Sequence, residues 1–582
     1  MANFTHSRRS STLVLMFNSK IVKMKFNNII YNISALVITA MLLFGCKKDL
    51  LDVTPTDRVS DAAILNDSTL FEKFVINRYM GVKLTDKEAE GTPPGFGRGF
   101  EYAMWSSLTD ESIYNNDDNT WLIQRGQLAP ENTGIAGTFW GRSYRSIREC
   151  NYALNNIDKV NMSDFHKKRL EGEIKFIRAY RYFDIIRNYG GAVLMGNKEF
   201  NLTDDLQDPS LFNRANIQES IDYTVAQLDT AALTLPIDND DSWMLGRATK
   251  GAALALKARL LLYAASPLYN AGTWQAAADA AKAVMDMGKY SIYQGGYGKL
   301  FLTPDNPEII FERLYAQGAR HVCLEIANGP NGYDGWGGNL PLQNLVDDYE
   351  MMDGKPITDP TSGYDPQNPY VNRDPRFYAT ILYNEAPYRG SKVETFVPGG
   401  KDSKDGPSNW NTSKTGYYLK KFMNDQLPID NPWDIAGTQP WIYMRYAEVL
   451  LNYAEAENEA AGPNPSVYAA VNQVRERAGV NMPDLPAGLS QDEMRQRIRM
   501  ERRVELAFEE FRYYDVRRWK IADQTENEPA YGIEVDKNGN NFTYKRKIAL
   551  DGKKFNVQNY WLPIPRAEIQ ASNGKLEQNP NY

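Results

Sequence analysis

Histidine and cysteine are both scarce in this chain, which holds three residues of each among 582. Beyond Cys46 only Cys150 and Cys323 remain, too few for a disulfide framework or a thiolate metal cluster, although one bridge between them stays open. The sequence also lacks the HExxH, GxSxG and Walker motifs of common hydrolases and nucleotide-binding enzymes. We therefore expect no catalytic residue, no cofactor and no structural metal; a calcium site near Asp238 and Asp240 stays open, although Thr249 replaces the glutamate expected in such a loop.

Acidic residues outnumber basic ones, with 73 Asp or Glu against 66 Lys or Arg. Hydrophobic residues make up 42% of the chain and charged residues 24%, which is typical of a globular protein and argues against a multispan membrane protein. The net charge is −7, and residues 1–45 contain five Lys or Arg and no Asp or Glu, so their removal would leave −12. An acidic body of this kind is unsuited to the phosphate contacts that bind nucleic acid.

The N-terminus carries the first strong signal. From Ser34 to Phe44 the sequence is an unbroken apolar run of signal-peptide length, too short to span a bilayer. The run ends in Leu-Phe-Gly-Cys, which resembles a bacterial lipobox, so we expect lipidation (palmitate or a similar acyl group) at Cys46. The alternative is a buried cysteine at the end of a core helix. The predicted signal peptide occupies residues 1–45.

Hydrophobic residues at steps of three and four predict a mostly α-helical fold. In 172–191 the pattern runs to Gly190, which should end the helix, and 248–266 followed by 274–288 is typical of a helical hairpin. Further helices are predicted over 441–460, 467–479 and 492–520. The pairing of helices suggests tetratricopeptide-like units, whose uneven spacing requires insertions. Residues 288–440, rich in Gly, Pro, Asn and aromatics, are expected to form long loops and short strands, as are residues 91–135.

Several colinear segments make the chain resemble the SusD/RagB family of Bacteroidota outer-membrane lipoproteins. They run from CKKDLLDVTPTD through EIKFIRAYRYFDIIRNYGGAVL, RATKGAALALKARLLLYAASPLYN and RYAEVLLNYAEAENEA to LPIPRAEIQASNGKLEQNPNY. The resemblance implies an N-terminal region over 46–287 with helix pairs, and a C-terminal region over 288–582 with ligand loops and further helix pairs. It also implies an outer-membrane, surface-exposed location, a SusC-type TonB-dependent transporter as partner and an oligosaccharide as ligand.

Two loops are the best candidates for contact with that ligand. Sugar rings need exposed aromatic planes beside hydrogen-bonding groups. The first loop combines Tyr114, Asn115, Asn116 and Trp121, and the second places Tyr333 and Trp336 among five glycines. Burial of these rings against their own loops is the competing interpretation. Trp410 and Trp433 are weaker candidates.

Two charge clusters are interpreted as structural. Asp374 before Pro375 favours a turn, in which the carboxylate bonds locally. A second set repeats at helical spacing and indicates a solvated or interhelical salt-bridge face: Arg502, Arg503, Glu505, Glu509 and Glu510.

Three other functions stay open. The same loops could bind peptides, as RagB-like proteins do, the chain could be a glycosidase built on two carboxylates, or it could be a lid that barely touches substrate.

Overall fold

The computed structural model describes residues 61–80, 103–117, 119–201, 203–316, 324–427 and 437–582. The chain divides into two units, Met1–Ile64 and Leu65–Tyr582. The predicted signal peptide, Cys46, Cys323 and Trp433 lie outside the described residues. In the first unit only the start of α2 (Asp61–Asn66) is described, so all that follows concerns the second unit.

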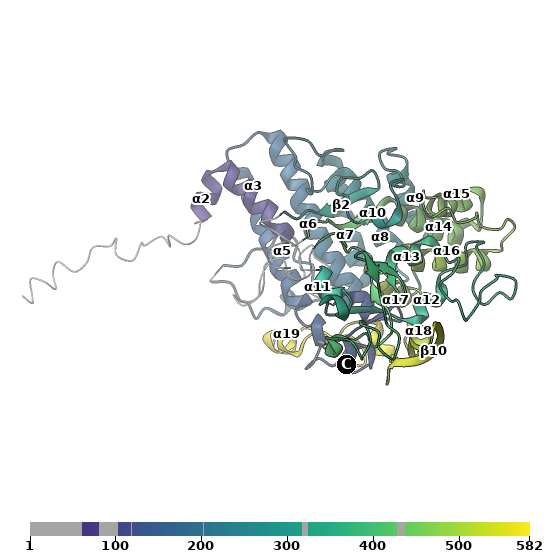
Figure 1. Ribbon diagram of the computed structural model, residues 1–582. Helices are drawn as coiled ribbons and strands as arrows, with labels where there is room; N and C mark the ends of the chain where they lie inside the picture. The colour runs from purple at the N-terminus through teal and green to yellow at the C-terminus, as the bar shows by residue number, and fades with distance from the viewer. Residues whose placement is uncertain (1–60, 81–102, 118, 202, 317–323, 428–436) are drawn as a thin grey trace, which may run out of the picture. The chain divides into compact units, whose positions relative to one another are not determined.

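The second unit is mostly helical, as the sequence predicts, and its long helices pack side by side in chain order (Figure 1). Each of α5 to α8 contacts the next helix, α9 then packs on α14, and α14 contacts both α15 and α16. The helices of this array are α5 (Phe139–Asn156), α6 (Asp164–Tyr189), α7 (Ile217–Thr234), α8 (Lys250–Ala265), α9 (Trp274–Met285), α14 (Tyr446–Ala461), α15 (Pro465–Arg475) and α16 (Gln491–Glu505).

Local capping fixes where these helices begin and end. The side chain of Ser163 accepts a hydrogen bond from the backbone N–H of His166 at the start of α6, and Gly190 ends that helix at φ 84°. Capping boxes open α7 at Asn216 and α16 at Ser490. The helix end predicted at Gly190 is therefore confirmed, whereas the helix predicted over 467–479 is observed as Pro465–Arg475.

Two of the predicted helices are shorter than the periodicity suggested. Residues 441–445 form strand β8 (Trp441–Arg445), which pairs with β2 (Ile309–Arg313), so Tyr443 belongs to a strand and α14 begins only at Tyr446. The helix predicted over 492–520 ends at Glu505 and resumes as α17 (Arg512–Arg518). Phe508 and Glu510 adopt positive φ between the two, a conformation that no α-helix accommodates.

The remaining elements are short, and many come from the loop-rich segment between α9 and α14. The other helices are α3 (Ser68–Asn77), α4 (Thr120–Gln124), α10 (Tyr297–Leu300), α11 (Leu324–Asn328), α12 (Gln343–Asp348), α13 (Pro375–Thr380), α18 (Ala522–Thr525) and α19 (Arg566–Ala571). The other strands form antiparallel pairs: β1 (Ser112–Tyr114) with β3 (Asn339–Pro341), β4 (Ile381–Leu382) with β7 (Tyr418–Leu419), β5 (Pro387–Tyr388) with β6 (Ser391–Lys392), and β9 (Ala530–Asn538) with β10 (Asn541–Leu550).

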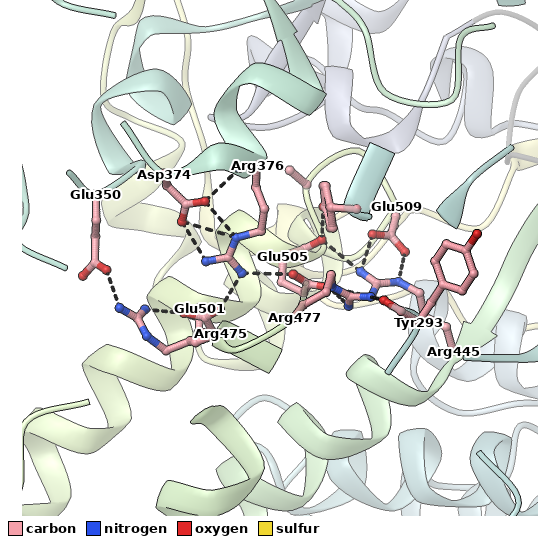
Figure 2. A network of polar contacts seen from close by, with 12 residues as sticks. Tyr293, Glu350, Asp374, Arg376, Arg445, Arg475, Arg477, Glu501, Glu505 and Glu509 are labelled. Atoms are coloured by element: carbon pink, nitrogen blue, oxygen red, sulfur yellow. Dashed lines mark hydrogen bonds and ion pairs between the residues drawn. The ribbon is translucent and has the colours of Figure 1, made fainter. Parts of the chain in front are cut away.

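A buried network of ion pairs joins the helix array to the loop-rich segment (Figure 2). The Arg445 guanidinium lies 2.7 Å from Glu505 Oε1 and 2.8 Å from Glu308 Oε1. Glu505 also pairs with Arg376 and Arg477, and all of these side chains are essentially inaccessible to water. The charged face predicted on this helix is thus interhelical, and its solvated alternative is wrong for Arg502, Arg503, Glu505 and Glu509, which are all buried.

Candidate ligand-binding site

The pairing of β1 with β3 brings the two candidate loops together. Ser112 is opposite Pro341 and Tyr114 is opposite Asn339, and the backbone N–H of Asn115 donates to the carbonyl of Gly338 at 2.8 Å. More than 220 residues separate the two strands, so no pattern within either loop indicates this contact. Two of the candidate side chains, Trp121 and Tyr333, pack against the same cluster of buried residues, which includes Ile113 of β1 and Leu340 of β3.

Two of the candidates in the first loop lie in the interior. Tyr114 is 6% exposed and Asn115 is 1% exposed. The Asn115 amide donates to the backbone carbonyl groups of Asn411 and Thr412, both at 3.3 Å. These side chains therefore hold the loop in place, whereas Asn116 is exposed.

Trp121 is half-buried, and two cations lie against its ring. Its indole Nε1 donates to the carbonyl of Tyr114 at 3.0 Å, which fixes the orientation of the ring. The guanidinium carbon of Arg125 and the Nζ of Lys414 each lie 5.2 Å from the ring centroid. The Trp121 ring therefore stabilises two cations by cation–π contact, in addition to offering an aromatic surface.

Tyr333 in the second loop has a similar environment. Its hydroxyl lies within hydrogen-bond distance of the carbonyl groups of Tyr388 and Lys392, at 3.2 and 3.1 Å. Lys401 Nζ donates to the same hydroxyl at 3.0 Å and lies 4.3 Å from the ring centroid. The loop does not bury Tyr333 by itself, but Tyr388 from a distant segment does so by edge-to-face contact at 5.0 Å.

Trp336 is half-buried and is held by the backbone of its loop. Its N–H donates to the carbonyl of Ile326 at 2.6 Å, and the next residue, Gly337, adopts φ 54°. A Cβ atom at Gly337 would lie 3.0 Å from the Asn411 carbonyl oxygen, so the close approach of the two segments requires glycine there.

Trp410 lies beside this loop pair and is the most exposed large aromatic near it, with 73% of its surface accessible. It sits in a short 3-10 helix, Asn409–Asn411, whose last residue accepts the hydrogen bond from Asn115 and donates to the Gly335 carbonyl. The sequence predicted Trp410 only as a weaker candidate for ligand contact, and it did not predict a role for Lys401 or Lys414. The Gly-, Ser- and Lys-rich run 399–416 around all three is the signal that could have indicated them.

Two family models match the chain. One is described as the SusD family and covers residues 307–582; the other is described as starch-binding associating with the outer membrane and covers residues 57–262. The chain belongs to the SusD/RagB family.

Relatives in the SusD/RagB family match along most of their length. A SusD-like protein from Bacteroides fragilis has a TM-score of 0.74 at 29% identity, with 91% of this chain and 100% of that chain covered. A SusD-like carbohydrate-binding protein from the same species has a TM-score of 0.74 at 26% identity, covering 88% and 100%. SusD-like protein P2 from Formosa agariphila is 24% identical over 509 residues, 82% of this chain and 90% of that protein.

A small cavity of about 100 Å³ lies beside the loops of this SusD/RagB protein. Its lining includes Asp402, Thr412 and Ser413. Burial raises the pKa of the Asp402 carboxyl to about 6, although the carboxylate accepts hydrogen bonds from the backbone N–H groups of Gly332 and Glu394. Asp402 thus anchors the second candidate loop from below.

In this SusD/RagB chain the two aspartates considered for a calcium site make other contacts, and Cys150, considered for a disulfide, is described without its possible partner Cys323. Asp238 pairs with Lys289 at 2.5 Å, and Asp240 accepts from the N–H and hydroxyl of Ser242. Cys150 is a buried free thiol. Among the described residues, no group of three or more His, Cys, Asp or Glu is placed to hold a metal ion, and no helix is long and apolar enough to cross a membrane.

Proposed function

We propose that this SusD/RagB protein binds an oligosaccharide at the outer membrane and passes it to a SusC-type TonB-dependent transporter. The observation that carries the proposal is the exposed ring of Trp410, on a segment that Asn411 joins to the loop of the half-buried Trp336, with β1–β3 pairing and Asn115 connecting the loops. Side chains that are already held in place lose little conformational entropy when a ligand binds. The flat face of an aromatic ring can then pack against the apolar C–H face of a sugar ring. The family description, starch-binding in association with the outer membrane, supports the same ligand class.

A direct test is calorimetric titration of the purified protein with a panel of oligosaccharides and with peptides of similar length. Binding of at least one glycan, weakened about tenfold or more by Trp336→Ala, is the expected result. Binding of peptides in the absence of any glycan binding would instead support the RagB-like alternative. Steady hydrolysis of a bound glycan, abolished by a single Asp or Glu substitution, would establish a glycosidase.

The lipid anchor is a part of the proposal that rests on the sequence around Cys46. Two or more acyl chains are needed for lasting attachment, and a lipidated N-terminal cysteine normally carries them. Mass spectrometry of the N-terminal peptide should therefore find acyl chains on Cys46 and no residue before it. A Cys46→Ala variant should leave the membrane fraction, and its continued presence there would contradict the anchor.

The transporter partnership is tested separately. We expect a SusC-type transporter to copurify with the tagged protein after mild detergent extraction. Copurification should survive Trp336→Ala, because that variant affects the ligand loops alone. Unchanged uptake of the bound glycan by a Trp336→Ala, Trp410→Ala double variant would indicate the purely structural lid.

A further inference from the structure

Positive charge gathers at the candidate loops without carboxylate partners. In the part of the chain that the structure describes, each of these cations donates only to neutral oxygen atoms: Arg125 to the Asp551 carbonyl, Arg389 to the Asn424 carbonyl, Lys401 to the hydroxyls of Tyr333 and Ser391, and Lys414 to the Asn115 carbonyl and amide. Each also lies within 5.4 Å of the centroid of an aromatic ring.

Some exposed lysines elsewhere on the unit pair with a carboxylate. Lys282 lies 2.6 Å from Asp286 and Lys545 lies 2.6 Å from Asp536. The loops have the same arrangement at Lys392, which pairs with Glu385 at 2.6 Å. Among the described residues, Lys401 and Lys414 instead lie against aromatic rings and donate to neutral oxygen atoms.

The carboxylates near Lys401 and Lys414 accept hydrogen bonds from backbone N–H groups. Asp117 accepts from the N–H of Trp121 at 2.9 Å, and Glu394 accepts from the N–H of Lys401 at 3.3 Å. Asp402 is buried beneath the loop and accepts from two backbone N–H groups. These carboxylates orient the loops, and the lysine Nζ atoms keep their remaining donors for a bound group.

A cation held against an aromatic ring is positioned and partly stripped of water, so it gains most from a charged acceptor that arrives with the ligand. The protein as a whole carries a net charge of −7 and repels polyanions at long range. A preference for anions at these loops must therefore come from local contacts.

We infer that the bound glycan is anionic and carries carboxylate or sulfate ester groups, which Lys401 and Lys414 contact beside Tyr333 and Trp121. This inference rests on the proposed function, because it names the chemistry of the ligand at the same loops. The sugar backbone packs on the exposed aromatic rings and the anionic substituent meets the lysine ammonium groups.

Matched probe pairs test the inference. Mannohexaose and hexamannuronate share a β-1,4 backbone and differ by the carboxylates, while laminarin and laminarin sulfate differ by the sulfate esters. At 50 mM NaCl we expect the anionic member of at least one pair to bind tenfold or more tightly than its neutral partner, and which pair responds distinguishes uronate from sulfate. The preference should fall steeply at 500 mM NaCl.

Neutral members that bind as tightly as the anionic ones, or tighter, would overturn the inference and leave the proposed function standing. Failure of both anionic probes to bind at millimolar concentration also overturns it. Peptide binding in place of every glycan would overturn the proposed function itself.

Variants then assign the preference to the two lysines. Lys401→Met and Lys414→Met should each reduce the ratio of anionic to neutral affinity about tenfold. Lys282→Met removes the same charge from the exposed face of α9 and should leave that ratio within twofold of wild type. Circular dichroism checks that each variant folds, and the salt dependence of the wild-type protein tests the inference even if one does not.

Discussion

Lys414 holds its ammonium group 5.2 Å from the centre of the Trp121 ring. Such a contact stabilises the cation and at the same time occupies part of the aromatic surface. Trp121 therefore contributes to the site chiefly through the charge that it positions, whereas Trp410 offers an open ring. The two tryptophans should respond differently to substitution.

Trp410→Ala should weaken glycan binding about tenfold or more without changing stability, because a side chain that is 73% exposed contributes little buried surface. Calorimetric titration and the urea unfolding midpoint measure the two effects. Phe165→Ala is the matched control, since Phe165 on α6 is 69% exposed and its ring lies 5.2 Å from the guanidinium carbon of Arg169 on the same helix. A loss of affinity equal in the two variants would contradict a specific role for Trp410.

Gly337→Ala should destabilise the protein by at least about 2 kcal/mol and reduce glycan affinity, because the new Cβ needs both positive φ and space that the Asn411 carbonyl and Tyr418 ring occupy. Urea unfolding measures the first effect. Gly363→Ala separates the two causes: Gly363 has φ 73° and nothing within 4 Å of an added Cβ, so only the backbone term of about 1 kcal/mol remains.

Arg445→Met should destabilise the protein by about 3–5 kcal/mol, because Arg445 is the one cation of the described network that contacts the buried carboxylates of Glu308, Glu505 and Glu509 together. The shift in urea midpoint measures this change. Arg495→Met removes a partly exposed ion pair with Glu459 and should cost less than about 1 kcal/mol. Equal losses in the two variants would show that the network in Figure 2 is no stronger than a surface pair.

Glu312→Gln should stabilise the protein at high pH. Burial raises the pKa of the Glu312 carboxyl to about 7, and its Oε2 has no hydrogen-bond partner. A carboxyl whose pKa is raised on folding gives its full stability below the ordinary value near 4.5, and loses it as the pH rises through about 7. The gain from Gln should therefore be about 2–3 kcal/mol at pH 8.5 and small at pH 5.

Urea unfolding of wild type and Glu312→Gln at both pH values gives this difference directly. Glu528→Gln, at an exposed position, controls for the change of net charge. A gain from Glu312→Gln that is the same at pH 5 and pH 8.5 would exclude titration of Glu312 as its cause.

Local patterns in the sequence predicted the helices well where caps and apolar spacing agree. The C-terminal end of α6 follows from Gly190 and the start of α15 from Pro465, and the effect of these two residues on the backbone does not depend on distant residues. By contrast, Trp441–Arg445 has the spacing of a helix and forms a strand, because pairing with β2 satisfies its backbone instead. The break at Phe508 likewise depends on nonlocal contacts, such as the hydrogen bond from the Trp105 N–H to Glu510.

The sequence predicted the two candidate loops separately, but it did not predict that they lie next to each other. Aromatic and amide residues marked each loop, but the burial of Tyr114 and Asn115 follows from packing on segments that lie 200 to 300 residues away in sequence. The positions of Lys401 and Lys414 follow from the same packing. Residue types can therefore indicate what a loop may bind, whereas the contacts between loops decide which atoms face the ligand.

The pairing of Ser112–Tyr114 with Asn339–Pro341 has a consequence for how the protein acquires its activity. A polypeptide that ends before residue 339 contains the helices from α5 to α9 and strand β1, but it lacks β3, with which β1 pairs. Long-range pairing of this kind forms slowly, because a large chain loop must close first. Under the proposed function, competence to bind a glycan should therefore appear only after the segment up to Pro341 has been synthesised and has paired with Ser112–Tyr114.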